Sequence, residues 1–176
     1  PDLASAAEST LGGNVATNAG GMRCVKYGVT RDAVRSLEVV LANGDVIRTS
    51  PPTVKAVGGL DLTSLLVGSE GTLGVITEIT VGLLPVPGPV RGITAGFSSS
   101  KAALDAANQI MAGPHRPSTL EFMDEVVIGA TLAYDPDAGL PTDAKAWLLV
   151  LTDARTAAAD DIASYVDVVR RHGAVR

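Results

Sequence analysis

Two glycine-rich segments hold the residues of this chain that are best suited to bind a ligand. The first runs from Gly12 to Gly21 and reads GGNVATNAGG. Glycine tolerates a positive φ and has no Cβ, so consecutive backbone N–H groups of such a loop can turn toward a phosphate or a planar ring. Thr17 and Asn18 add side-chain donors in the same stretch. We therefore expect a loop that wraps an anion.

The second segment, residues 68–77, reads GSEGTLGVIT. Its glycines stand between a short helix-like run and a run of β-branched residues, which predicts a turn between a helix and a strand. Neither segment contains the G-x-G-x-x-G dinucleotide fingerprint or a P-loop pattern. A Rossmann domain and a P-loop nucleotidase are therefore disfavoured.

Five features occur in one order along the chain: the first glycine segment, Tyr27-Gly28, Arg31-Asp32, Asn43-Gly44 and the second glycine segment. Together they resemble the FAD-linked oxidase family of the vanillyl-alcohol-oxidase type, and most of all its D-lactate dehydrogenases and glycolate oxidases. The resemblance implies FAD as the cofactor. For the tyrosine-glycine and arginine-aspartate pairs we favour a structural role.

The resemblance also implies which residues contact FAD. The first segment is expected near the pyrophosphate and the polar edge of the isoalloxazine, and the second near the adenine and ribose. The alternative for the glycines is a purely structural turn, and for Glu70 a brace of its own loop. The expected cofactor-binding residues are Asp2, Ser9, Thr10, Gly12, Gly13, Thr17, Asn18, Gly20, Gly21, Glu70, Gly71, Val75 and Ile76.

The implied reaction is oxidation of a small 2-hydroxy acid, such as D-lactate, glycolate or D-2-hydroxyglutarate, by hydride transfer to FAD, with a separate electron acceptor. The alternatives are a non-oxidative flavin enzyme of the alkyl-glycerone-phosphate synthase type and a folded fragment that is inactive in isolation. In the family a further glycine-rich loop lies upstream and the catalytic histidine segments lie downstream. We interpret the chain as a fragment, expect it to hold FAD weakly and assign no catalytic residue.

Composition limits the other partners. The chain has 176 residues and a net charge of −5, and no basic tract offers the phosphate contacts of a nucleic-acid-binding protein. No apolar run is long enough to cross a bilayer. The single cysteine, Cys24, favours a reducing compartment, the cytoplasm, and is expected to be a buried small hydrophobe. His115 and His172 lack metal-site spacing, so no metal is expected. A homodimer is left open.

Local patterns predict the elements that position the two segments. Alternating apolar residues on both sides of Asn43-Gly44 predict an antiparallel hairpin over 36–49. Asp61 is a candidate N-cap for a short helix that ends at Gly68. The run from Val75 onward predicts a strand.

Three prolines between Pro85 and Pro89 predict a stiff connection and a domain boundary. We expect an α+β chain. Residues 1–89 are interpreted as the C-terminal part of a vanillyl-alcohol-oxidase-type FAD-binding domain. Residues 90–176 are interpreted as the incomplete start of an α/β substrate or cap domain, whose sheet is expected to have an unpaired edge.

Strands and helices alternate in this second part. Strands are expected at 93–97, 120–123 and 147–151, and helices between the serines at 98–100 and Gly113, at 124–134 and at 156–172. Serines 98–100 and Asp124 are candidate N-caps. The first helix is expected to turn Leu104, Ala107, Ile110 and Met111 inward, and the last helix to turn Ile162, Tyr165, Val166 and Val169 inward. Both histidines are expected at the surface or at helix ends.

Overall fold

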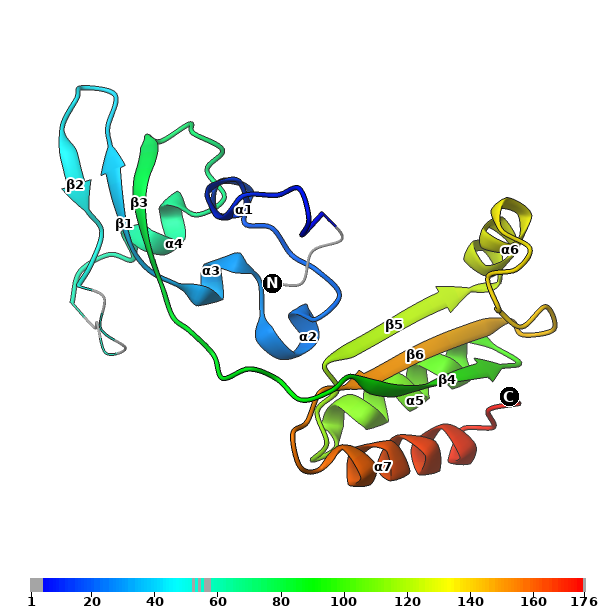
Figure 1. Cartoon of the computed structure of the whole chain (residues 1–176). Coiled ribbons are helices and arrows are strands. Elements are labelled where there is room, and N and C mark those ends of the chain that lie inside the picture. The colour runs from blue at the N-terminus through cyan, green and yellow to red at the C-terminus, as the bar shows by residue number, and fades with distance from the viewer. Residues whose placement is uncertain (1–4, 52, 54, 56–57, 176) are drawn as a thin grey trace. The chain divides into compact units, whose positions relative to one another are not determined.

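The computed structural model describes residues 5–51, 53, 55 and 58–175. The chain divides into two compact units, Pro1–Pro85 and Val86–Arg176. Each unit has its own antiparallel sheet and its own hydrophobic core (Figure 1). The predicted mixture of helices and strands is confirmed.

The sheet of unit 1 has the strand order β2-β1-β3, in which β1 spans Val34–Val40, β2 spans Val46–Arg48 and β3 spans Val75–Val81. The predicted hairpin of β1 and β2 is confirmed. Its turn differs from the tightest two-residue type, because Gly44 adopts a positive φ of 87° while Asn43 does not. Instead, the Asn43 side-chain oxygen accepts the N–H of Asp45 at 3.1 Å.

Four short helices accompany this sheet: α1 at Leu11–Thr17, α2 at Cys24–Tyr27, α3 at Thr30–Ala33 and α4 at Leu62–Leu66. The expectation that the first glycine segment is a loop is wrong over most of its length, because α1 occupies it. Thr10 explains the difference, since its hydroxyl accepts the N–H of Gly13 at 3.1 Å as an N-cap. Val15, which is fully buried, then anchors the helix to the core.

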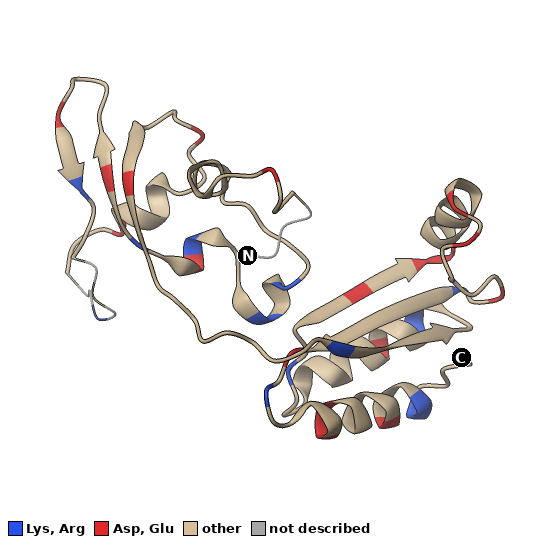
Figure 2. Ribbon diagram, in the orientation of Figure 1, with Lys and Arg blue, Asp and Glu red and all other residues tan. Residues whose placement is uncertain are grey.

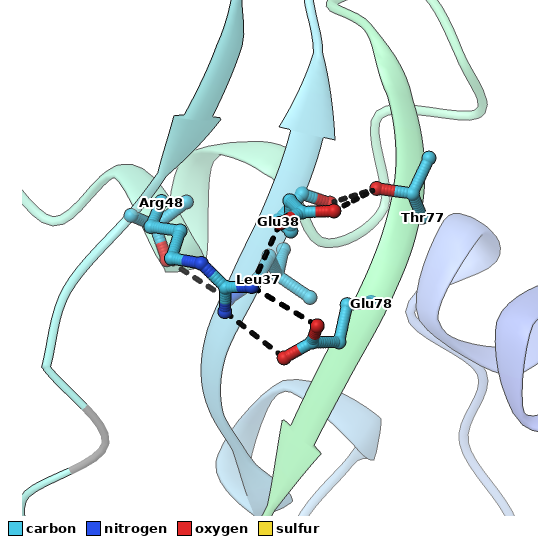
Figure 3. Close-up of polar contacts among 6 residues, drawn as sticks. Leu37, Glu38, Arg48, Thr77 and Glu78 are labelled. Carbon is cyan, nitrogen blue, oxygen red and sulfur yellow. Dashed lines mark hydrogen bonds and ion pairs between the residues drawn. The ribbon is translucent and has the colours of Figure 1, made fainter.

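The face of the sheet that carries Glu38 is polar. Figure 2 shows charged positions side by side across β2, β1 and β3, and Figure 3 shows how they interact. The Arg48 guanidinium donates to Glu38 at 2.7 Å and to both carboxylate oxygens of Glu78 at 2.9 and 3.0 Å. The hydrogen bond and charge of Arg48 lower the pKa of Glu78. The three side chains thus link all three strands on the solvent-facing surface.

The sheet of unit 2 has the order β4-β6-β5, with β4 at Arg91–Phe97, β5 at Thr119–Asp124 and β6 at Ala146–Thr152. The long helices α5 (Ser100–Ala112) and α7 (Ala158–Arg171) pack on one face of this sheet, and α6 (Glu125–Tyr134) follows β5 (Figure 1). All six predicted elements are found. Ser99 and Asp124 are confirmed as N-caps, accepting N–H groups at 3.2 and 2.9 Å.

The predicted inward face of α5 is partly wrong. Leu104 and Met111 are 46% and 39% exposed, whereas Ala103, Ala106 and Ile110 are buried. The face of the helix that carries Ala103, Ala106 and Ile110 packs in the core, so Leu104 and Met111 point toward solvent. A helical spacing of apolar residues did not distinguish these two faces because both satisfy it.

The last helix buries a carboxylate that the sequence did not single out. Asp161 lies on α7, and its two carboxylate oxygens contact His115 Nδ1 at 2.8 Å and the Thr152 hydroxyl. His115 is therefore half-buried and paired rather than a surface residue, while His172 lies at the C-terminal end of α7 as predicted. Burial and the nearby charge of Asp161 raise the pKa of Tyr165 to about 12.

Of the other residues predicted to face inward on α7, Val169 is buried, while Ile162 and Val166 are only half-buried. Val168, which was not predicted to face inward, is buried instead.

Candidate functional site

The two glycine-rich segments lie against each other in unit 1. The N–H of Gly68 donates to the carbonyl of Val15 at 2.9 Å, and the N–H of Glu70 donates to the carbonyl of Ala16 at 3.0 Å. The carbonyls in the last turn of a helix have no partner inside the helix. The second segment therefore supplies hydrogen bonds to the C-terminal end of α1. We call the surface made by residues 9–21 and 68–76 the glycine junction.

The side chains of the first segment are used largely within the protein. The Thr17 hydroxyl donates to the Gly13 carbonyl at 3.0 Å, one helical turn earlier. Asn18 ends α1 in the left-handed conformation, at φ 49°, and its side-chain oxygen accepts the N–H of Arg31 at 2.9 Å. Among the described residues the Asn18 amide nitrogen makes no hydrogen bond. Of the two side-chain donors expected in this segment, Thr17 and Asn18, only the Asn18 amide is therefore available to a ligand in the described structure.

The second segment is a tight turn. The N–H and the hydroxyl of Thr72 both donate to the Ser69 carbonyl, at 3.0 and 2.6 Å. Glu70 and Gly71 both have a positive φ, of 50° and 78°. The brace expected from the Glu70 carboxylate is not found among the described residues, and the backbone N–H of Glu70 holds this turn to α1 instead. Its exposed carboxylate has no hydrogen-bonding partner among the described residues.

The glycines of the junction differ in the space that they leave open. A Cβ on Gly12 or Gly71 would have no atom of the described residues within 4 Å, whereas a Cβ on Gly74 would lie 2.7 Å from Val39 Cγ1 and 2.8 Å from the Val40 carbonyl oxygen. Gly74 is thus needed for packing against β1. Gly12 and Gly71 instead leave open space beside the backbone, and the positive φ of Gly71 also favours glycine there.

The other predicted site residues differ in their exposure and in their hydrogen bonds. Ser9 accepts a hydrogen bond from Asn14 at 3.4 Å, and the N–H of Gly21 donates to the half-buried Cys24 Sγ at 3.0 Å. Gly20 is exposed, Val75 is 64% exposed and Ile76 packs partly against the core. Asp2 lies outside the described residues.

The pair Arg31-Asp32 does not form a surface ion pair, because each residue has a different partner. The Asp32 carboxylate accepts the N–H of Val29 at 2.8 Å at the start of α3. The Arg31 guanidinium donates to the Val67 carbonyl at 3.1 Å. Sequence reasoning missed Arg31 as a part of the junction, although its place in the family motif was the available signal.

Asp61 caps the helix that leads into the second segment. Its carboxylate accepts the N–H and the hydroxyl of Ser64 at 2.9 and 2.6 Å, and the hydrogen bond from the Ser64 side chain holds the pKa of Asp61 below its usual range. A lowered folded-state pKa gives stability that is present above the unfolded pKa, near pH 4, and is lost as the pH falls through the folded pKa.

Asp61→Ala is expected to lower the free energy of unfolding by about 1 kcal/mol at pH 7. The loss is expected to shrink at about pH 2.5, where the wild-type cap is also weakened. Asp61→Asn keeps a capping oxygen and should retain most of the stability. It should remove the part of the pH dependence of stability that arises from the Asp61 carboxyl. Urea denaturation at both pH values measures this, and an equal loss for Asp61→Ala at both would contradict it.

The described residues hold no group of three or more His, Cys, Asp or Glu side chains that could bind a metal ion. Within the same residues, every helix is too short or too polar to span a bilayer.

Comparison with protein-family models gives two matches. A model described as "FAD binding domain" matches residues 1–50, and a model described as "FAD linked oxidases, C-terminal domain" matches residues 87–176.

Curated relatives agree with these models. Over 153 residues the chain is 49% identical to glycolate oxidase subunit GlcD of Bacillus subtilis, covering 87% of the chain and 32% of the relative. Over 120 residues it is 42% identical to D-lactate dehydrogenase of Anaerostipes hadrus, covering 68% of the chain and 25% of the relative. The chain thus spans a third or less of these two relatives.

Solved structures of alkyldihydroxyacetonephosphate synthase share the fold. One of them superposes with a TM-score of 0.75 at 24% identity, over 94% of this chain and 33% of that chain. At this level of identity the likeness concerns the fold alone.

Proposed function

Since this chain belongs to the FAD-linked oxidase family, whose cofactor is FAD, we propose that the glycine junction forms part of the FAD site of an enzyme that oxidises a small 2-hydroxy acid. D-lactate, glycolate and D-2-hydroxyglutarate are the substrates proposed. The names of the relatives, a glycolate oxidase component and a D-lactate dehydrogenase, support this class. Electrons then pass to a separate acceptor.

We assign the two units to two parts of such an enzyme. Residues 1–89 are the second half of the FAD-binding domain, and residues 90–176 begin the C-terminal substrate or cap domain. The division of the chain at Pro85 and the ranges of the two family models support this assignment.

The observation that carries the proposal is the meeting of the two glycine segments, with open space beside Gly12 and Gly71. A backbone without side chains lets a dinucleotide approach closely, and the free Asn18 amide nitrogen can donate to it. The residues proposed to hold FAD are Asp2, Ser9, Thr10, Gly12, Gly13, Thr17, Asn18, Gly20, Gly21, Glu70, Gly71, Val75 and Ile76.

FAD, when bound, accepts the hydride from the substrate carbon, and the protein binds and orients it. Two sets of hydrogen bonds in the chain hold the residues that are proposed to contact FAD. Backbone hydrogen bonds hold the second segment against α1, and the N-cap of Thr10 fixes the first turn of α1. The exposed Glu70 carboxylate is suited to a ribose hydroxyl rather than to a diphosphate, because like charges repel.

The visible spectrum of the protein at its natural full length tests this function. The purified protein is mixed without oxygen with a panel of 2-hydroxy acids. Bleaching of the flavin by one acid supports the proposal and identifies the substrate. A bound flavin that no acid bleaches would favour a non-oxidative enzyme of the alkyldihydroxyacetonephosphate synthase kind, and absence of flavin would overturn the cofactor assignment.

A further inference from the structure

Arg31 bonds the first glycine segment and the residue that directly precedes the second. Its backbone N–H donates to the Asn18 side-chain oxygen at 2.9 Å, at the end of the first segment. Its guanidinium donates to the carbonyl of Val67 at 3.1 Å, directly before Gly68. One residue thus joins two segments that lie far apart in the sequence.

Helix α3 holds Arg31 in place. The hydroxyl and the N–H of Thr30 both donate to the Ala19 carbonyl, at 2.8 and 3.1 Å, so the first turn of α3 is fixed to the first segment. Asp32 closes the same turn by accepting the N–H of Val29. The backbone of Arg31 is therefore fixed to the first segment. Its side chain extends from there to the Val67 carbonyl, next to the second segment.

The contact between the segments is close at this point. A Cβ on Gly68, which has a φ of 84°, would lie 3.0 Å from Asn18 Cβ and 3.7 Å from an Arg31 guanidinium nitrogen. The N–H of Gly68 makes the first of the two hydrogen bonds from the second segment to carbonyls in the last turn of α1. A shift of Val67 would move both glycine segments relative to each other.

We propose that Arg31 is a positioning residue for the FAD site: it fixes the separation of the two glycine segments, so FAD affinity depends on it although its guanidinium is bonded within the protein. This inference rests on the proposed function. The Val67 carbonyl is neutral, so the guanidinium keeps its positive charge, and Arg31→Lys, which also keeps the charge, separates the effect of position from the effect of charge.

The test compares Arg31→Ala with Arg31→Lys and with Arg48→Ala in the protein at its natural full length. Arg48 lies in the same unit, and among the described residues its side chain bonds Glu38 and Glu78 on the sheet surface and no residue of the junction, so Arg48→Ala removes an equal charge without touching the junction. Hydrogen exchange at the amides of Gly68 and Glu70 is measured without FAD, and the FAD dissociation constant is measured separately.

Arg31→Ala is expected to speed exchange at both amides and to weaken FAD binding, each on the order of tenfold, equivalent to about 1.4 kcal/mol. Arg31→Lys keeps one donor and should give intermediate values, which also covers the case in which the alanine variant does not fold. Arg48→Ala should match the wild type in both measurements.

Wild-type exchange at Gly68 and Glu70 in the Arg31 variants would overturn the inference, and so would wild-type FAD affinity in Arg31→Ala. A wild-type protein that binds no FAD overturns the proposed function instead. The exchange measurement separates the two failures because it does not require the cofactor.

Discussion

Gly28→Ala is expected to destabilise unit 1 by about 2–4 kcal/mol, as the sum of backbone strain and a lost helix cap. Gly28 has a φ of 74° and a ψ of −170°, a conformation that is essentially restricted to glycine. A Cβ at this position would lie 2.1 Å from a carboxylate oxygen of Asp32. Asp32 would have to release the N–H of Val29, and the first turn of α3 would lose its cap.

Loss of the α3 cap is expected to disturb the glycine junction as well, because α3 carries Arg31. We expect Gly28→Ala to lose bound FAD as well as stability. Urea denaturation gives the free energy of unfolding, and hydrogen exchange in β1 assigns the loss to unit 1. A change below about 1 kcal/mol would contradict the prediction, since it would show that Asp32 can move at little cost.

Gly129→Ala is the matched control for this substitution. Gly129 lies inside α6, and a Cβ there would have no atom within 4 Å. Alanine in a helix interior is more favourable than glycine by up to about 1 kcal/mol. The same change of residue is therefore expected to be neutral or stabilising at this site, with no effect on FAD.

Gly12→Val is expected to weaken FAD binding by at least about 100-fold, equivalent to about 2.7 kcal/mol, while the fold is retained. Gly12 is exposed, and a Cβ there would have no atom of the described residues within 4 Å. Valine is a slightly better helix former than glycine, so stability should not fall. The loss would arise because the branched side chain occupies the space that the cofactor needs.

Titration of the apoprotein with FAD, followed by quenching of flavin fluorescence, measures this affinity. Gly129→Val makes the same substitution outside the glycine junction and should leave the affinity unchanged. If Gly12→Val bound FAD as tightly as the wild type, the surface beside Gly12 would not be the FAD site, and the two glycine segments would have to be reinterpreted as structural turns.

The success of the local predictions has a common physical basis. The N-caps Asp61, Ser99 and Asp124 were recognised because a capping side chain bonds an N–H only three residues further along the chain. The hairpin around Gly44 was recognised because its turn, too, is specified by neighbouring residues, Asn43 and Gly44. The loop expected at Gly12–Gly21 was wrong because glycine content outweighed the N-cap signal of Thr10 and the buried position of Val15.

The predictions that failed or stayed incomplete concern faces and partners. Leu104 and Ala103 are adjacent on α5, and only the sheet beneath decides which of them is buried. Asp161 looks like an ordinary acidic residue in the first turn of α7, yet the fold buries it, and His115, 46 residues earlier, and Thr152 satisfy its carboxylate.

By itself, the sequence determined the family and its cofactor, the order of the helices and strands from β1 onward, and the N-caps of α4, α5 and α6, because these depend on motifs and on neighbours within a helical turn. Only the tertiary structure decided that the two glycine segments meet, that Arg31 spans 36 residues to bond Val67, and that Gly74 serves packing while Gly12 and Gly71 face open space. These properties depend on atoms brought together by folding, and no local pattern specifies them.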